Sequence, residues 1–227
     1  MNKLIESFKD YYFKMSCKVP DGHKCYAGYY HRGHVRCVLI PDGENEIFDG
    51  PFDYQGDRKY ATGNYYRDMK HGKWSFEYLG HSCTKWLSVC FNKGRVEGPL
   101  KFEVENQGMT TNTMSGMLVN IADGKVKGPV VGLLNDCFLQ ADFDADGQPD
   151  GHWILNMETD DMGCHHFHHE LYRHGKLLES YETRSDYKSK RPVQANLYKR
   201  LAYLLTAECS PLLTLIARGT ITSQLTM

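Results

Sequence analysis

The sequence predicts an all-β fold: an elongated, twisted antiparallel meander of six to seven β-hairpin repeats, with short helical caps at both ends. A short pattern recurs along the chain: an aromatic or apolar strand, a tight turn, a glycine, and a large apolar residue two positions later. Successive copies are 22 to 30 residues apart, a spacing typical of repeat proteins. Apolar and polar side chains alternate within the copies, which indicates antiparallel strands buried on one face.

The glycine that follows each turn is the reference position of the repeat. It is present in five copies and replaced by glutamate in the sixth, at Gly50, Gly72, Gly98, Gly128, Gly151 and Glu179. Two positions later stand the apolar residues Phe52, Trp74, Leu100, Val130, Trp153 and Tyr181. Because side chains of a strand alternate between its faces with a period of two, we expect these residues to share the buried face.

Tight turns are expected about four residues before the reference position. The pairs Asp123-Gly124, Asp146-Gly147 and His174-Gly175 stand where a hairpin needs backbone with positive φ, which glycine adopts without a steric clash. Each copy therefore predicts a β-hairpin of about 20 residues. A single hairpin is not stable in water, so we expect the hairpins to stack side by side into one sheet.

The segment from Gly63 to Trp74, which ends in Lys70-His71-Gly72-Lys73-Trp74, resembles the MORN repeat. It is most similar to the bacterial variant found in antitoxin-type repeat proteins. The resemblance covers residues 28–183, and Glu179 and Gly132 depart from the pattern. It implies a scaffold that binds another protein, with a toxin as one example of such a partner.

The chain divides into three predicted parts. Residues 1–16 form an N-terminal helical cap, since Leu4, Ile5 and Phe8 recur at helical spacing. Residues 17–187 form the MORN-like repeat domain, and residues 188–227 form a C-terminal helical segment. The division lies at the point where strand-like alternation gives way to helical spacing.

The C-terminal segment has two interpretations. Leu197, Leu201, Leu204 and Leu205 form one helical stripe, and a second helix begins at Ser210-Pro211. The segment could cap the terminal edge strand, which repeat sheets need to prevent edge pairing. The alternative is a helix that binds a partner.

Composition and charge limit the classes of function. Lys and Arg number 27 against 28 Asp and Glu, and no basic stripe runs along any predicted strand, which argues against nucleic-acid binding. The first residues lack the apolar stretch of a secretory signal, and no run approaches the ~18 apolar residues that cross a bilayer. We therefore expect a cytoplasmic protein without a transmembrane segment.

The cysteines do not form a recognisable site. The chain has 8 cysteines and no Cys-x-x-Cys pair, which disfavours a zinc ribbon or a thioredoxin-type redox site. Without a secretory signal, reduced thiols are favoured, and a disulfide framework is the alternative.

The segment Cys164–His169 is the densest group of potential metal ligands. On a strand, Cys164, His166 and His168 would share one face and form a zinc or nickel triad, with the Phe167 face packed. Neighbours on one face are about 6–7 Å apart along a strand, which is wide for a shared ion. Because the ligands are so dense here, a metal-binding protein or metal-dependent enzyme is still the first alternative function.

The run Asp142–Asp150 resembles the start of a calcium-binding loop. Such a loop needs a bidentate acid at its twelfth position, which here is Trp153. The repeat register explains the same residues as a turn, so we favour the turn.

No nucleophile elbow, phosphate loop or metal-helix motif is present, so we predict a non-enzymatic protein without a cofactor. Mixed charge on an extended sheet suits recognition of another protein. A lipid-headgroup-binding MORN module is the second alternative, but the balanced charge weighs against it. The residues expected on turns or the outer face, and so the candidates for binding, are Arg67, His71, Lys73, Lys101, His152 and Arg173.

Overall fold

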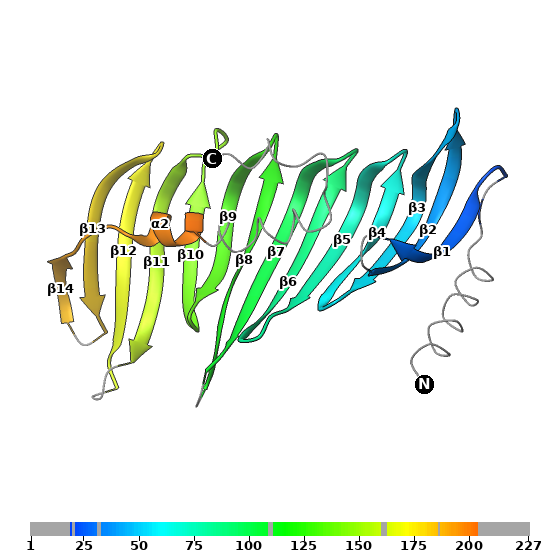
Figure 1. The fold of residues 1–227 in the computed structure, drawn as a ribbon. Helices are drawn as coiled ribbons and strands as arrows, with labels where there is room; N and C mark the ends of the chain where they lie inside the picture. Colours follow the sequence, from blue (N-terminus) through cyan, green and yellow to red (C-terminus); the bar gives the residue numbers. More distant parts are fainter. Residues whose placement is uncertain are drawn as a thin grey trace.

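The structure, a computed structural model, describes residues 19, 21–30, 33–108, 111–159, 163–185 and 187–203. In this part of the chain, fourteen strands form one antiparallel sheet in which each strand pairs with its neighbours in sequence (Figure 1). The predicted all-β meander is therefore confirmed. Six hairpins that contain the repeat pattern run from β2 to β13, and β1 and β14 form the two edges of the sheet.

The strands are β1 (Lys24–Tyr30), β2 (Gly33–Asp42), β3 (Asn45–Gly56), β4 (Lys59–Tyr66), β5 (Met69–Leu79), β6 (Cys83–Asn92), β7 (Arg95–Gln107), β8 (Asn112–Ala122), β9 (Lys125–Leu134), β10 (Cys137–Phe143), β11 (Pro149–Thr159), β12 (His165–Arg173), β13 (Lys176–Arg184) and β14 (Tyr187–Pro192). β14 crosses the boundary predicted between residues 187 and 188. The predicted helices over residues 1–16 and from Pro211 lie outside the described residues.

The predicted turns have the backbone that two-residue hairpins require. Asp123-Gly124 and His174-Gly175 have positive φ at both residues, the conformation that matches the twist of the flanking strands. Between β10 and β11 the turn is longer, and only Gly147 of the predicted pair Asp146-Gly147 has positive φ. The short turns bring the two strands of a hairpin into direct pairing next to the turn, as at Ala122 and Lys125 and at Arg173 and Lys176.

A β-bulge with two extra residues lies just after the turn in each of the first five hairpins. In the β6–β7 hairpin, Phe91 pairs with Val96 and Val89 with Leu100, so that Cys90 alone stands opposite three residues. The same three-against-one arrangement occurs in β2–β3, β4–β5, β8–β9 and β10–β11. Each bulge contains the reference glycine, and all five have positive φ, at Gly50, Gly72, Gly98, Gly128 and Gly151.

The sixth hairpin departs from this geometry. Tyr172 pairs with Leu177 and Leu171 with Glu179, so the bulge has one extra residue in place of two. Glu179 does not have positive φ. Because one extra residue reverses the alternation of side chains, Tyr181 points to the outer face. Our prediction that Tyr181 shares the buried face with the other repeat residues was therefore wrong.

One face of the sheet, the core face, holds the apolar residues of the repeats. Trp74 and Trp153 are both fully buried, and their ring N–H groups donate to equivalent carbonyl oxygens, those of Asn64 at 2.9 Å and Asp142 at 3.0 Å. The predicted equivalence of the two tryptophans is therefore confirmed. A Cβ at Gly63 would collide with the Trp74 ring, so the indole packs directly on the backbone of β4.

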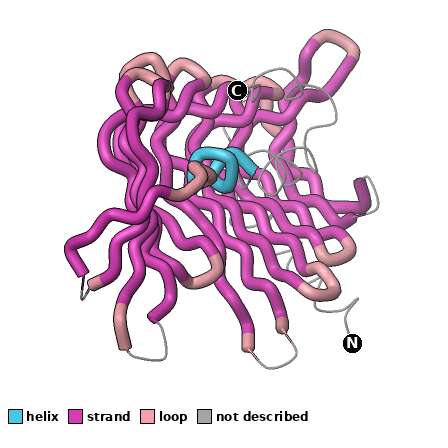
Figure 2. The backbone as a smooth tube through the Cα atoms, turned by 90° about the vertical axis from the view of Figure 1, so that its left-hand side faces the viewer, coloured by secondary structure: helices cyan, strands magenta, loops and turns pink. Residues whose placement is uncertain are grey.

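The helix α2 (Leu197–Tyr203) lies against the core face in front of β10 and β11 (Figure 1). Figure 2 shows the same helix inside the curve of the twisted sheet. Leu197 and Leu201 are buried, as the predicted helical stripe requires, and Tyr198 packs against Trp153. α2 covers the core face at β10 and β11 and not the edge strand β14, which the predicted cap would cover. The rest of the predicted C-terminal segment, with Leu204 and Leu205, lies outside the described residues.

We expect Trp74→Ala and Trp153→Ala each to lower the free energy of unfolding by about 3–5 kcal/mol, because each removes a fully buried aromatic side chain. Urea unfolding measures this change. Lys73→Ala is the control at an exposed neighbour and should change stability by less than about 0.5 kcal/mol. A cost below about 1 kcal/mol for either tryptophan would contradict the repeat register.

A second expectation concerns the left-handed glycines. Gly128 has a φ of 73°, and an added Cβ there would meet nothing within 4 Å, so Gly128→Ala tests the backbone alone. It should cost about 1–2 kcal/mol by thermal or urea unfolding. Glu97→Ala, at an exposed bulge position without positive φ, should be near neutral. Equal effects of the two changes would show that the glycine conformation is not required.

Candidate functional site

The outer face of the sheet carries one continuous row of side chains, with one residue from each strand. Residues that pair directly across neighbouring strands lie on the same face, so the pairing register connects the row. Its character changes from hydroxyl groups on β4–β6 to apolar groups on β8 and β9, and to rings on β12 and β13. In strand order the row is Ala27, Arg36, Asp53, Thr62, Ser75, Ser88, Lys101, Leu118, Val131, Gln140, Ile154, His169, Tyr181 and Pro192.

The middle of the outer face is an exposed apolar patch on three adjacent strands. Leu118 pairs with Val131, and Leu133 pairs with Phe138. These four residues, which we name the outer apolar patch, are 49%, 45%, 38% and 46% exposed, respectively. Gly116 pairs with Leu133 and has no side chain to cover it. Large apolar side chains gathered in this way mark binding surfaces on soluble proteins.

A groove of about 280 Å³ adjoins this patch on β4–β7. Small hydroxyl side chains of the outer row, such as Ser75, line the groove beside Trp86. The Trp86 indole N–H donates to Glu77 Oε1 at 3.2 Å, which fixes the ring. Lys101 also lines the groove and pairs directly with Leu118 of the patch. Groove and patch therefore form one surface from β4 to β10.

The sequence did not lead us to the outer apolar patch, although a signal was present. Leu118 stands between Met117 and Val119, so β8 is apolar on both faces at this point. Val131 and Leu133 interrupt the alternation of β9 in the same way. Apolar residues at successive strand positions are also typical of strands buried on both faces, so the signal alone would not have identified an exposed patch.

The six residues predicted to bind a partner are all exposed, but the structure does not bring them together. Lys101 and His152 lie on the outer face on opposite sides of the outer apolar patch. Arg67 and Arg173 lie at a turn or a strand end, and His71 and Lys73 lie within β5. The positions are Arg67 in the β4–β5 turn, His71 and Lys73 on β5, Lys101 on β7, His152 on β11 and Arg173 at the end of β12.

The predicted metal triad does not form. Among the described residues, no group of three His, Cys, Asp or Glu side chains could hold a metal ion. We expected the Phe167 face of β12 to be packed, and this was wrong. His168 pairs with Leu155 and is only 4% exposed, so it and His166 face the core, whereas Cys164 precedes the strand. The reason is the pairing of β12 with β11. Residues that pair directly share a face, and Trp153 and Leu155 of β11 face the core.

Glu170, two residues further along β12, anchors α2 to the sheet. Its side chain is fully buried, and its Oε1 accepts hydrogen bonds from the backbone N–H groups of Asn196 at 2.6 Å and Leu197 at 3.0 Å. The Tyr172 hydroxyl donates to Oε2 at 2.7 Å, and His168 Nε2 lies 3.3 Å from Oε1. A carboxylate satisfied in this way can remain ionised in the core.

These contacts determine the acidity of the Glu170 carboxyl group. Burial alone would raise its pKa, because it disfavours the charged form. The hydrogen bonds from His168, Leu197, Tyr172 and Asn196 outweigh burial and lower the pKa to about 2. Of the three residues that resembled a metal site in the sequence, His168 contacts the carboxylate that holds α2 in place.

A stack of rings occupies the outer face of β11–β14. The His152 and His169 rings are stacked with their centroids 5.0 Å apart, and His169 stacks on Tyr181 at 4.7 Å. Lys190 Nζ lies 4.1 Å from the centre of the Tyr181 ring, and Glu179 forms an ion pair with Lys190. Burial, and to a smaller extent the neighbouring positive charges, lowers the pKa of His169, so the stack favours the neutral imidazole.

The acidic run Asp142–Asp150 forms a turn. Asp144 Oδ1 accepts the backbone N–H groups of Asp146 and Gln148, both at 2.9 Å, and its Oδ2 lies 3.0 Å from His174 Nδ1. The hydrogen bond from Gln148, and after it the one to His174, lowers the pKa of Asp144. Both oxygens of this carboxylate are therefore engaged within the protein, which agrees with the turn favoured above.

A buried lysine lies on the core face and was missed in the sequence. Lys70 is 7% exposed, and its Nζ lies 5.4 to 5.9 Å from the centres of the Tyr65, Trp74 and Phe91 rings. Burial lowers the pKa of Lys70 to about 8. The equivalent position two residues before the reference glycine is apolar elsewhere, as at Val96, and this contrast was the available signal. Here the rings hold the ammonium group by cation–π attraction.

No family model matches this chain, and no curated protein matches it. The described residues include no helix whose length and hydropathy would let it cross a membrane. Six cysteines in the described ranges are free thiols, and of these only Cys37 is fully buried. Cys17 and Cys209 lie outside the described residues.

The Glu170 carboxylate should make the free energy of unfolding depend on pH in the acidic range. A carboxyl group whose pKa is lower in the folded state contributes stability above its unfolded value, near 4.5, and loses it as the pH falls toward about 2. We expect Glu170→Gln to cost roughly 3 kcal/mol at pH 7 and to flatten the fall in unfolding free energy below pH 5. Glu179→Gln is the exposed control. Parallel pH profiles for Glu170→Gln and the unchanged protein would contradict the anchoring role.

Proposed function

We propose that this chain is a non-enzymatic β-sheet scaffold that binds another protein through its outer face. The outer apolar patch is the observation that carries this proposal. Four large apolar side chains on β8–β10 are exposed together and form two cross-strand pairs. A surface of this kind forms the centre of a protein interface when polar groups surround it.

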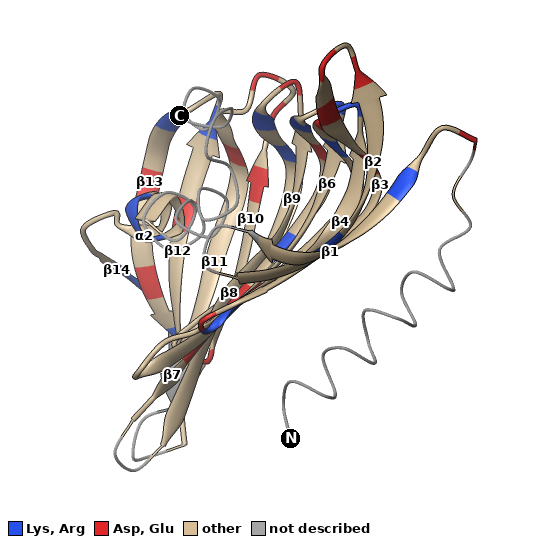
Figure 3. Cartoon of the chain, turned by 45° about the vertical axis from the view of Figure 1, so that its right-hand side comes forward, with Lys and Arg blue, Asp and Glu red and all other residues tan. Residues whose placement is uncertain are grey.

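The surroundings of the patch define the kind of partner. Lys101 and Glu103 form an ion pair at 2.9 Å on the β7 side, and His152 lies on the β11 side. Charges of both signs are scattered over the strands and turns (Figure 3). A protein surface with an apolar centre and mixed charge at its rim matches this pattern. An anionic membrane would instead reward clustered lysine and arginine.

The length of the surface fits a protein–protein interface of standard size. Groove and patch together extend over the seven strands from β4 to β10. Strands lie about 4.8 Å apart, so the surface is roughly 29 Å long, a scale suited to a standard interface of about 800 Å² per partner. The resemblance to antitoxin-type MORN repeat proteins agrees with such a role, and a toxin is one partner of this kind. A cytoplasmic location is part of the same proposal.

Leu118→Glu tests this proposal, with Leu178→Glu as the matched control. Leu118 and Leu178 are 49% and 48% exposed, but only Leu118 lies in the patch. A partner purified with the unchanged protein from its native host, in fixed stoichiometry, should bind Leu118→Glu at least 10-fold more weakly, because a charge at the interface centre must be desolvated. Binding to Leu178→Glu should be unchanged. Isothermal titration calorimetry gives both affinities.

The two variants must have the same melting temperature for this comparison to hold. Equal affinity of the partner for both variants would contradict binding through the patch. Binding of the unchanged protein to anionic liposomes, without a protein partner, would contradict the proposed function and support the lipid alternative.

A further inference from the structure

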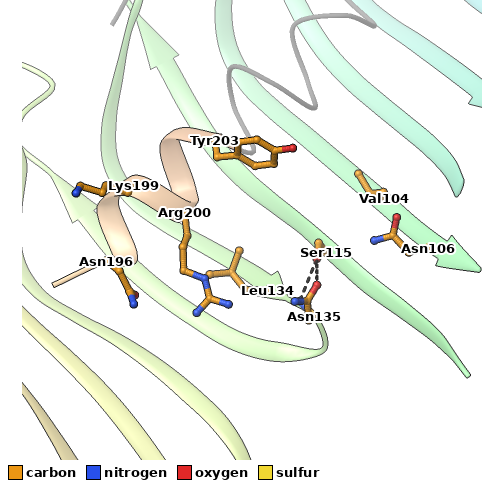
Figure 4. A pocket seen from close by; sticks show the side chains of 9 residues that line it. All are labelled: Val104, Asn106, Ser115, Leu134, Asn135, Asn196, Lys199, Arg200 and Tyr203. Atoms are coloured by element: carbon orange, nitrogen blue, oxygen red, sulfur yellow. Dashed lines mark hydrogen bonds between the residues drawn. The ribbon is translucent and has the colours of Figure 1, made fainter. Parts of the chain in front are cut away.

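A cavity of about 410 Å³ lies between α2 and the core face of β7–β9, and the function proposed above does not use it. Glu170, Leu197 and Leu201 fix α2 against the sheet, so the helix side of the cavity is held in place. The volume lies within the range of small-molecule sites, about 300–1,000 Å³. Figure 4 shows side chains from both the helix and the sheet around one space.

The sheet contributes an apolar floor and one oriented amide. Val104 and Leu134 are buried apolar residues of the lining. The Ser115 hydroxyl donates to Asn135 Oδ1 at 3.2 Å and accepts the Asn135 backbone N–H at 3.0 Å. The carbonyl oxygen of the Asn135 side chain is thereby engaged, and its NH₂ group remains a donor at the cavity (Figure 4).

The helix contributes positive charge. Lys199 and Arg200 both line the cavity, and the Arg200 guanidinium extends from α2 toward the sheet (Figure 4). Neither residue forms an ion pair with another described residue, and no carboxylate occurs among the described lining residues. The polar groups offered to a ligand are therefore mainly donors, which match an oxyanion.

We propose that this cavity binds a small organic oxyanion, a carboxylate or a phosphate ester on a short apolar body. Arg200 and Asn135 hold the charged head from opposite sides, Lys199 adds long-range attraction, and the body lies against Val104 and Leu134. Arg200 is the better suited of the two cations, because its planar fork can bind two oxygens of one head group. A ligand held by both helix and sheet would also tighten the attachment of α2.

Hexyl phosphate and hexanoate combine a head and a body of the proposed kind, whereas inorganic phosphate and hexanol each lack one part. Isothermal titration calorimetry on the full chain should show hexyl phosphate or hexanoate binding at least 10-fold more tightly than inorganic phosphate, and no binding of hexanol. The tighter of the two probes identifies the preferred head group.

Arg200→Gln tests the assignment of the head site. It should weaken binding of the tighter probe by 10-fold or more, since a charge-assisted hydrogen bond is lost. Arg95→Gln, an exposed arginine at the start of β7, should have no effect. Absence of binding by hexyl phosphate and hexanoate at millimolar concentration would overturn the proposal. Equal affinity of Arg200→Gln and Arg95→Gln would overturn it as well. Neither result depends on the protein partner, so this proposal and the scaffold function can fail separately.

Discussion

The bulge with two extra residues, which follows the turn in the first five hairpins, is the constraint on which the rest of the sheet depends. Three residues stand opposite one, and the glycine among them adopts a left-handed conformation that other residues reach only at a cost of about 1–2 kcal/mol. Two extra residues are an even number, so the side chains on both sides of the bulge keep to the same face. This parity gives the sheet one apolar face and one outer face over five hairpins.

The sixth hairpin shows the effect of replacing this glycine. Glu179 lies in a bulge with one extra residue, and the later part of β13 is turned over. Tyr181 then joins His169 on the outer face, while Ser180 and Glu182 pair with Glu170 and His168 on the core face. The core face thus becomes polar at this end of the sheet, and its buried carboxylate anchors α2 over the apolar part.

Much of this fold could be predicted from the sequence, because it rests on local rules. Glycine spacing and alternation were enough to place the hairpins and to equate Trp74 with Trp153. The orientation of Tyr181 and His168 was not predictable in the same way. The face of Tyr181 depends on the number of residues in the sixth bulge, and the face of His168 depends on its pairing with Leu155 of β11. In both cases only pairing with another strand determines the face. The outer apolar patch and the cavity beneath α2 combine residues from separate hairpins, so no single motif indicates either of them.

Cross-strand disulfide formation would test the role of the bulge most directly. Two variants each carry His169→Cys, one with Tyr181→Cys and the other with Ser180→Cys, and peptide mass spectrometry after mild oxidation identifies the bonds. Directly paired residues on one face lie within disulfide distance, about 4.4–6.8 Å between Cα atoms. We predict a bond between positions 169 and 181 and none between 169 and 180. Absence of the bond between positions 169 and 181, with or without a bond between 169 and 180, would show that the sixth hairpin preserves the faces, and would contradict the link between the left-handed glycine and the register.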